Sequence, residues 1–286
     1  MGTVTMSQIA PMNIHYVLYP LDYFLDKLVS LELQAVELWG GSPHVPIEDL
    51  KLSDVSRLRR GIEARGLAIA CFTPETCVYP INLAAEDEAL RRRSIAYALK
   101  SLDIASELGT GLMQIVAGRG YYDKPTDDAW KRSRDAIELI ARKAETLGIR
   151  LTMEPLLYHE SNLVHNLHTA QRMMQEIGSP HLGCNVDTVP MVVAGDSLEA
   201  YFTELGERVN HIHLCDGSPQ GHVPLGSGNL PLASFLKELG ERGYQGYIGL
   251  ETCGAKHYLE PDRHLEQSID TIRRALGLQG PEGRKP

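Results

Sequence analysis

The chain has 286 residues, of which 43% are hydrophobic and 23% charged, and its formal net charge is −9. These proportions are typical of a globular protein and exclude disorder over most of the length. The acidic balance argues against a nucleic-acid partner, because proteins that bind nucleic acid usually carry a basic face. We therefore expect chemistry on a small molecule.

Cellular location is indicated by the apolar runs and the cysteines. No apolar run reaches about 18 residues, so we expect no transmembrane helix and no membrane partner. The beginning of the chain lacks the basic residues and the long apolar run of a signal peptide. The five cysteines, at positions 71, 77, 184, 215 and 253, are scattered and odd in number. This favours reduced thiols and a cytoplasmic protein.

Short apolar runs alternate with segments of helical periodicity. The runs predict a weak opening strand near 4–9 and further strands at 35–39, 67–73, 111–116, 149–154, 181–187, 209–215 and 247–252. Helices are predicted at 21–30, 84–108, 126–147, 198–205, 232–242 and 261–276. This alternation predicts an α/β fold, a single (β/α)8 TIM barrel over residues 1–276, with a flexible tail at 277–286. A doubly wound sheet is the alternative, but no GxGxxG motif follows the first strand.

Four late strands end in side chains that can bind a metal ion, namely Glu154, Asp187, His213 and Glu251. Functional residues of such barrels gather at the carboxyl ends of the strands. Because side chains alternate along a strand, the residues two positions earlier should also point inward; they are Thr152, Asn185, His211 and Gly249. For His211, a hydrogen bond that supports the site and plain packing are equally open.

Three carboxylates placed close together repel one another unless a cation neutralises them. Carboxylates with one imidazole suit a hard or borderline divalent ion. We expect one such ion, with Mn²⁺ first, Co²⁺, Mg²⁺ or Ni²⁺ as alternatives, and Zn²⁺ less favoured.

The sequence around these four residues, with Pro155 after Glu154 and Asp216 after His213, resembles the metal-site motifs of the xylose-isomerase-like TIM barrels. Within that family it is most similar to the ketose 3-epimerases. The segments 37–44, 73–76, 79–80, 154–156, 160–162 and 222–224 resemble the fructoselysine 3-epimerases more than the enzymes that act on free sugars. The resemblance extends from roughly residue 10 to residue 275.

This resemblance implies a metal-dependent isomerase that inverts carbon 3 of a ketose through an enediolate. It implies that Glu154, Asp187, His213 and Glu251 bind the metal. The family's acid and base correspond to Glu154 and Glu251. It also implies that Glu160, six residues after Glu154, contacts the substrate.

Four further residues are candidates for contact with the sugar substrate, each with a plainer alternative. Trp39 is either an apolar wall for the ligand or a core aromatic residue. Glu75 either faces an ammonium group of a substituent or is a loop acid in solvent. Arg119, after the fourth strand, either closes over the ligand or lies on the surface. His222, after the seventh strand, is a candidate site residue because some relatives place a metal-site histidine there.

Two features of the enzymes that act on free ketohexoses are missing. Those enzymes place a histidine three residues after the metal-binding aspartate and an arginine six residues after the metal-binding histidine. This chain has Pro190 and Pro219 there, and a proline side chain cannot hydrogen-bond a hydroxyl group. The resemblance therefore favours a ketose derivative of the fructoselysine or psicoselysine type.

Other activities of this fold remain open. They are 3-epimerisation of a free or phosphorylated ketose, aldose–ketose isomerisation of the hydroxypyruvate type, and dehydration of a keto-inositol. A hydrolase resembling endonuclease IV is the least favoured, since the net charge of −9 does not suit a DNA-binding face. We also expect a homo-oligomer.

Overall fold

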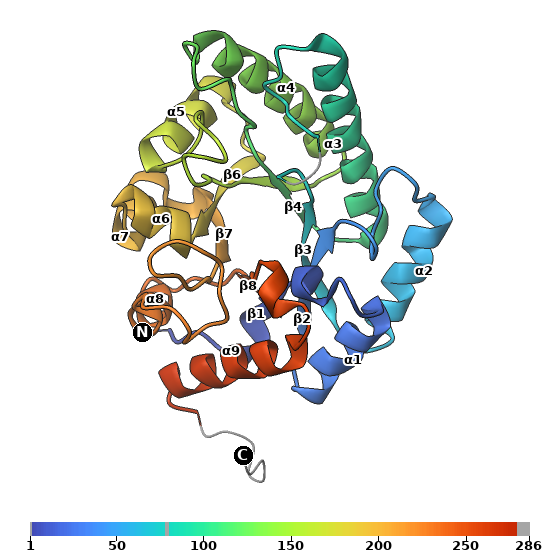
Figure 1. Cartoon of the computed structure of the whole chain (residues 1–286), viewed down its shortest axis with the longest axis vertical. Helices are drawn as coiled ribbons and strands as arrows, with labels where there is room; N and C mark the ends of the chain where they lie inside the picture. The colour runs from blue at the N-terminus through green and yellow to red at the C-terminus, as the bar shows by residue number, and fades with distance from the viewer. Residues whose placement is uncertain (1, 78–79, 279–286) are drawn as a thin grey trace.

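The computed structural model describes residues 2–77 and 80–278. Its eight parallel strands form one sheet in the order β1-β8-β7-β6-β5-β4-β3-β2. The strands are β1 (Ile9–Pro11), β2 (Ala35–Gly40), β3 (Ala68–Pro74), β4 (Leu112–Ile115), β5 (Arg150–Met153), β6 (Leu182–Asp187), β7 (Val209–His213) and β8 (Ile248–Leu250). A parallel bridge between Met12 and Glu37 joins the two ends of the sheet. The sheet is therefore a nearly closed barrel (Figure 1).

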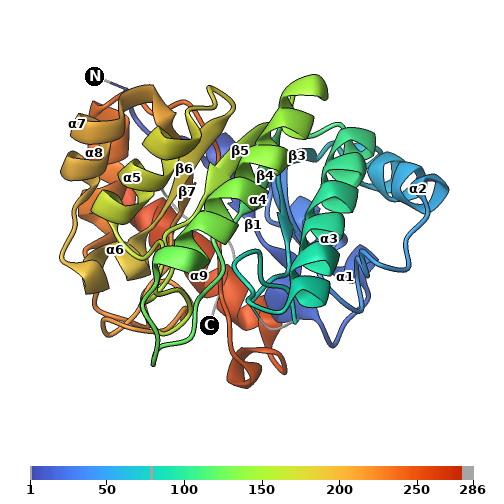
Figure 2. The ribbon, with the colours of Figure 1, turned by 90° about the horizontal axis from the view of Figure 1, so that it is seen from above.

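Helices surround this barrel. They are α1 (Leu21–Ser30), α2 (Leu52–Glu63), α3 (Glu88–Leu108), α4 (Asp127–Thr146), α5 (Leu167–Ile177), α6 (Thr188–Ala194), α7 (Leu198–Leu205), α8 (Leu232–Glu241) and α9 (Pro261–Ala275). Neighbouring helices such as α3 and α4 pack side by side on the outside of the strands (Figure 2). The predicted (β/α)8 architecture is confirmed. Of the predicted tail, residues 279–286 lie outside the described residues.

Within the described residues, no helix combines the length and the apolar character that a membrane span requires.

The predicted opening strand at 4–9 is wrong. The strand β1 begins only at Ile9, and the preceding residues Met6–Gln8 form a 3₁₀ turn. The Gln8 side chain accepts a hydrogen bond from the Thr5 backbone N–H at 3.0 Å and donates one to the Tyr244 carbonyl at 3.0 Å. Such local side-chain hydrogen bonds compete with an extended backbone.

Helix boundaries follow local capping, and some helices were missed. α3 begins at Glu88 rather than at the predicted residue 84, because the Asp87 carboxylate accepts a hydrogen bond from the Leu90 N–H at 2.7 Å.

Three helices, α2, α5 and α6, were not predicted from the sequence. α2 buries only Val55 and Ile62 completely, which leaves a narrow apolar stripe, and α6 is only 7 residues long.

The register of the late strands orients the polar side chains. Asn185 pairs with His211, and Asp187 pairs with His213, so that corresponding side chains lie at the same level. Between them, Val186 and Ile212 form the alternate pair and are buried in the main apolar core. The predicted division into a polar inner face and an apolar outer face is therefore correct for these strands.

We predict that acid destabilises the fold through His15, which is buried after β1. Burial, with the charges of His264 and His257 adding to it, lowers the pKa of His15 to about 3. A lowered pKa contributes stability above the unfolded-state value of 6.5, and this is lost progressively as the pH falls below that value. Between pH 7 and pH 5 this residue should cost about 2 kcal/mol of unfolding free energy.

Urea unfolding of His15→Met at both pH values tests this prediction, since methionine does not titrate. The variant should lose that part of the pH dependence, whereas His168→Met, which alters an exposed histidine of α5, should keep it. Equal pH dependence in wild type and His15→Met would contradict the prediction.

Candidate metal centre

The four predicted metal ligands meet at the carboxyl end of the barrel. One ligand atom from each of Glu154, Asp187, His213 and Glu251 lies within 4.8 Å of the others. Asp187 and His213 are the last residues of β6 and β7, and Glu154 and Glu251 directly follow β5 and β8. Strands far apart in the sequence therefore deliver these four side chains to one place.

The imidazole of His213 is oriented so that one nitrogen faces all three carboxylates. His213 Nδ1 lies 2.9 Å from Glu154 Oε1, 3.3 Å from Glu251 Oε2 and 3.9 Å from Asp187 Oδ2. This buried nitrogen makes no hydrogen bond, whereas Nε2 donates one to Glu37 Oε1 at 2.9 Å. In the neutral ring, Nδ1 therefore presents a lone pair to carboxylate oxygens, which is repulsive unless a cation lies between them. These donors fit a divalent ion.

The charges of this cluster of Glu154, Asp187, His213 and Glu251 also fit a divalent ion. Burial, with the charges of Glu251 and Asp187 adding to it and that of His213 opposing it, raises the pKa of Glu154 to about 7. Burial alone would lower the pKa of His213, but the charges of Glu37 and Glu154 raise it well above its usual value. Both shifts reflect an excess of buried negative charge, which a divalent cation would neutralise.

Glu37 of β2 is a supporting residue that the sequence analysis did not assign to the site. Its carboxylate is completely buried and accepts hydrogen bonds from His213 Nε2 and from His211 Nε2 at 2.8 Å. A third bond comes from Thr73 Oγ1 at 2.5 Å. Burial alone would raise the pKa of Glu37, but the charges of His213 and His211 lower it far below its usual value. His211 is thus a supporting residue and not plain packing.

One signal in the sequence pointed to Glu37, because it is the only acid within an otherwise apolar strand and a buried charge requires partners. Its site also requires space. A Cβ atom on Gly249 of β8 would lie 2.1 Å from Glu37 Oε2 and 2.9 Å from His213 Cδ2. Any larger residue at position 249 would therefore displace this network.

Hydrogen bonds hold the other carboxylates in place. Glu154 accepts hydrogen bonds from Gln114 Nε2 at 2.5 Å and from Asn185 Nδ2 at 3.0 Å. Asp187 uses Oδ1 to cap α6, accepting from the Val189 N–H at 2.7 Å, so that Oδ2 remains directed at the cluster. Gln114 was not predicted, although it lies on the inward-facing side of β4.

His222, from the loop between β7 and α8, reaches the same cluster. Its Nε2 lies 3.0 Å from Asp187 Oδ2 and 3.9 Å from Glu251 Oε2. Burial alone would lower the pKa of His222, but the charges of Asp187 and Glu251 raise it to about 10. The structure thus places this candidate beside the predicted metal ligands, where an N–H donor faces two carboxylates.

Trp39 and Glu75 pair with each other at the ends of β2 and β3. The Trp39 indole N–H donates to Glu75 Oε2 at 2.9 Å, and the Cys77 backbone N–H donates to Glu75 Oε1 at 2.6 Å. Both side chains are buried, so Glu75 is not an acid in open solvent.

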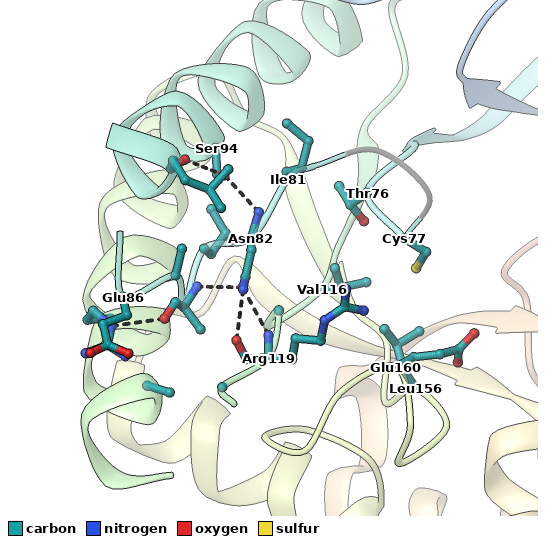
Figure 3. A pocket seen from close by; sticks show the side chains of 18 of the residues that line it. Thr76, Cys77, Ile81, Asn82, Glu86, Ser94, Val116, Arg119, Leu156 and Glu160 are labelled. Atoms are coloured by element: carbon teal, nitrogen blue, oxygen red, sulfur yellow. Dashed lines mark hydrogen bonds between the residues drawn. The ribbon is translucent and has the colours of Figure 1, made fainter. Parts of the chain in front are cut away.

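Glu160 and Arg119 line a cavity of about 950 Å³ beside the four predicted metal ligands. Burial raises the pKa of Glu160, and the charge of Glu251 contributes, whereas that of His222 opposes it. Arg119 is exposed, and its side chain lies between Asn82 and Glu160 in the view of Figure 3. All five predicted substrate contacts therefore lie at or near the same end of the barrel.

Comparisons with known proteins agree with this geometry. The family model described as a xylose isomerase-like TIM barrel matches residues 25–275. Fructoselysine 3-epimerase of Escherichia coli O157:H7 is 29% identical over 259 residues, covering 90% of this chain and 94% of its own. Ketose 3-epimerase of Arthrobacter globiformis is 24% identical over 210 residues, covering 72% of this chain and 71% of its own.

A solved structure of an L-ribulose 3-epimerase has a TM-score of 0.79 with this chain at 19% identity, and the match covers 95% of each. At that identity the likeness concerns the fold. Because the family model matches most of the chain, from residue 25 to residue 275, the protein belongs to the xylose isomerase-like TIM-barrel family.

Proposed function

We propose that this protein is a divalent-metal-dependent 3-epimerase of a ketose or a ketose derivative. The observation that carries the proposal is the position of Glu154 and Glu251, which reach one imidazole lone pair from two separate strands. The proposal is supported by relatives named as 3-epimerases that match most of the chain.

Epimerisation at carbon 3 requires that a proton leave one face of the substrate and that another return to the opposite face. A divalent ion, held by Glu154, Asp187, His213 and Glu251 and most suitably Mn²⁺, would polarise the substrate oxygens and lower the pKa of the carbon-bound proton. Glu154 and Glu251 follow strands that β6 and β7 separate in the sheet. We assign the removal and the return of the proton to these two carboxylates.

Hydrogen bonds orient the two carboxylates that we assign to proton transfer. Glu154 is oriented by Gln114 and Asn185, and Glu251 Oε1 accepts a hydrogen bond from the Cys253 thiol at 3.2 Å. We assign contacts with the substrate to His222, which lies beside Asp187 and Glu251, and to Glu160, Trp39, Glu75 and Arg119 at the same end of the barrel. To Asp187 we assign metal binding alone.

The substrate we propose is a fructosamine of the fructoselysine or psicoselysine type. The name of the relative that is 29% identical supports this choice. Pro190 lies buried in the first turn of α6, and Pro219 follows a cis peptide bond in the loop after β7. Neither side chain can hydrogen-bond a sugar hydroxyl, so we expect groups outside the sugar to contribute to binding.

We predict that the protein with Mn²⁺ converts a ketose substrate into its 3-epimer with deuterium from D₂O at carbon 3. NMR of the products checks this, with free ketohexoses, ketose phosphates and fructosamines as substrates. Chelation should abolish turnover, and Mn²⁺ or Co²⁺ should restore it.

The products also separate this proposal from the alternatives. Deuterium at carbon 1 would identify an aldose–ketose isomerase, and loss of water would identify a dehydratase. Full turnover in a preparation proved free of metal would contradict metal dependence.

Glu154→Gln and Glu251→Gln should each lower kcat by at least about 100-fold, because each removes a group that transfers a proton. Both residues also bind the metal, so rates are compared at equal and saturating metal occupancy. Glu145→Gln, which alters an exposed carboxylate of α4, serves as the matched control. A fully loaded Gln variant with the wild-type rate would remove that residue from the mechanism.

Glu37→Gln should weaken metal binding by about 10- to 100-fold, because the carboxylate that orients His213 loses its charge. Titration of the metal-free protein with Mn²⁺ measures this dissociation constant without a need for substrate. Unfolding by urea reports separately whether the buried network still folds. An unchanged dissociation constant in a folded variant would show that Glu37 does not support the metal ligand.

A further inference from the structure

The cavity that Glu160 and Arg119 line adjoins the cluster of four predicted metal ligands. Its inner wall includes Gln114, which donates to Glu154 Oε2 at 2.5 Å, and Leu156, two residues beyond Glu154. As the described residues form it, the wall includes none of the four predicted metal ligands. The cavity therefore adjoins Glu154 through the side chain of Gln114.

The size of this cavity suits more than a sugar. Its volume of about 950 Å³ is near the upper end of the range of about 300–1,000 Å³ for sites that enclose drug-sized ligands. Much of its wall is apolar, with side chains such as Ile81, Leu83, Val116 and Leu156. Methylene groups of a substituent would be removed from water on this surface.

Two opposite charges of the cavity wall differ in their burial. Glu160 is the inner one, because its side chain is half-buried whereas Arg119 is exposed. Its Oε2 accepts from the Leu157 N–H at 3.1 Å. Arg119 is the outer one, on the loop after β4. The wall thus combines a half-buried carboxylate, apolar side chains and an exposed guanidinium group, and its other acids, such as Glu86 and Asp127, are exposed.

Arg119 differs from the lysines in the cavity wall. Lys124 pairs with Glu86 at 2.8 Å, and Lys131 lies 3.8 Å from Asp128. Within residues 2–77 and 80–278, no carboxylate forms an ion pair with Arg119. Its backbone is fixed, however, because Asn82 accepts from the Arg119 N–H at 3.0 Å and donates to its carbonyl at 2.9 Å (Figure 3).

We propose that this cavity receives the substituent on carbon 1 of the substrate, and that Arg119 binds a carboxylate at its far end. This inference rests on the proposed function. The chemical class is a ketose joined through a secondary amine to an amino acid by several methylene groups. Its ammonium group next to the sugar complements Glu160, its methylenes complement the apolar wall, and its carboxylate complements the guanidinium group.

Anionic substrates come from two sources, since a ketose phosphate also offers an anion to an arginine. It has neither an ammonium group next to carbon 1 nor a methylene chain, however. The charges in the cavity therefore favour the amino-acid carboxylate. Glu160 in particular has no favourable partner in a phosphorylated sugar.

The test compares three substrates: fructoselysine, the pentylamine adduct of fructose, which lacks the terminal carboxylate and the α-ammonium group, and fructose 6-phosphate. Arg119→Ala should lower kcat/KM for fructoselysine at least about 10-fold more than for the pentylamine adduct, which is the loss expected for a charge-assisted hydrogen bond. Arg119→Lys should restore part of the loss. Lys124→Ala, which alters a paired cation of the same cavity, should show no such selective loss.

Equal losses on fructoselysine and the pentylamine adduct would overturn the inference, as would a selective loss on fructose 6-phosphate. Calorimetric binding of fructoselysine to the Mn²⁺-loaded protein separates this inference from the proposed function. Binding that Arg119→Ala weakens, without epimerisation of any of the three compounds, would support the cavity assignment and reject the epimerase. Epimerisation that Arg119→Ala leaves unchanged would support the epimerase and reject the cavity assignment.

Discussion

The hydrogen bond from His213 Nε2 to the buried carboxylate of Glu37 is the interaction on which the proposed metal centre depends. It joins residues 176 positions apart and leaves Nδ1 directed at three carboxylates. An isolated carboxylate in the barrel interior would be costly. Here Glu37 is compensated by a hydroxyl group from the neighbouring strand β3 and by two imidazoles from β7, which β1 and β8 separate from β2. The interior of the barrel is therefore built to orient a ligand as well as to fill space.

The same network explains the residues found at positions 73 and 249. Gly249 leaves the space that the Glu37 carboxylate occupies, and Thr73 supplies a hydroxyl donor from β3. Because the interior is close-packed, a change in any of these residues would shift the others. The proposed metal affinity and the stability of the fold therefore depend on one set of contacts, which is the physical reason to measure both in every variant.

The division of labour around the site follows from where the elements end. The carboxyl ends of β5 to β8 carry the proposed metal ligands, whereas the loops after β3 and β4 form much of the adjoining cavity. Rigid strands suit groups whose mutual distances decide the chemistry, and loops suit groups that select a substituent. In this arrangement the proposed reaction and the proposed specificity reside on different parts of the barrel.

Much of this was determined by the sequence by itself. The alternation of strands and helices predicted the barrel, and the period of two along each strand placed Glu154, Asp187, His213 and Glu251 at one level, because both patterns are local. Only the tertiary structure decided that Glu37 holds His213, that Glu75 pairs with Trp39, and that Asn82 fixes Arg119 beside a cavity. These contacts join distant segments, and no local periodicity encodes which buried donors and acceptors meet once the barrel closes.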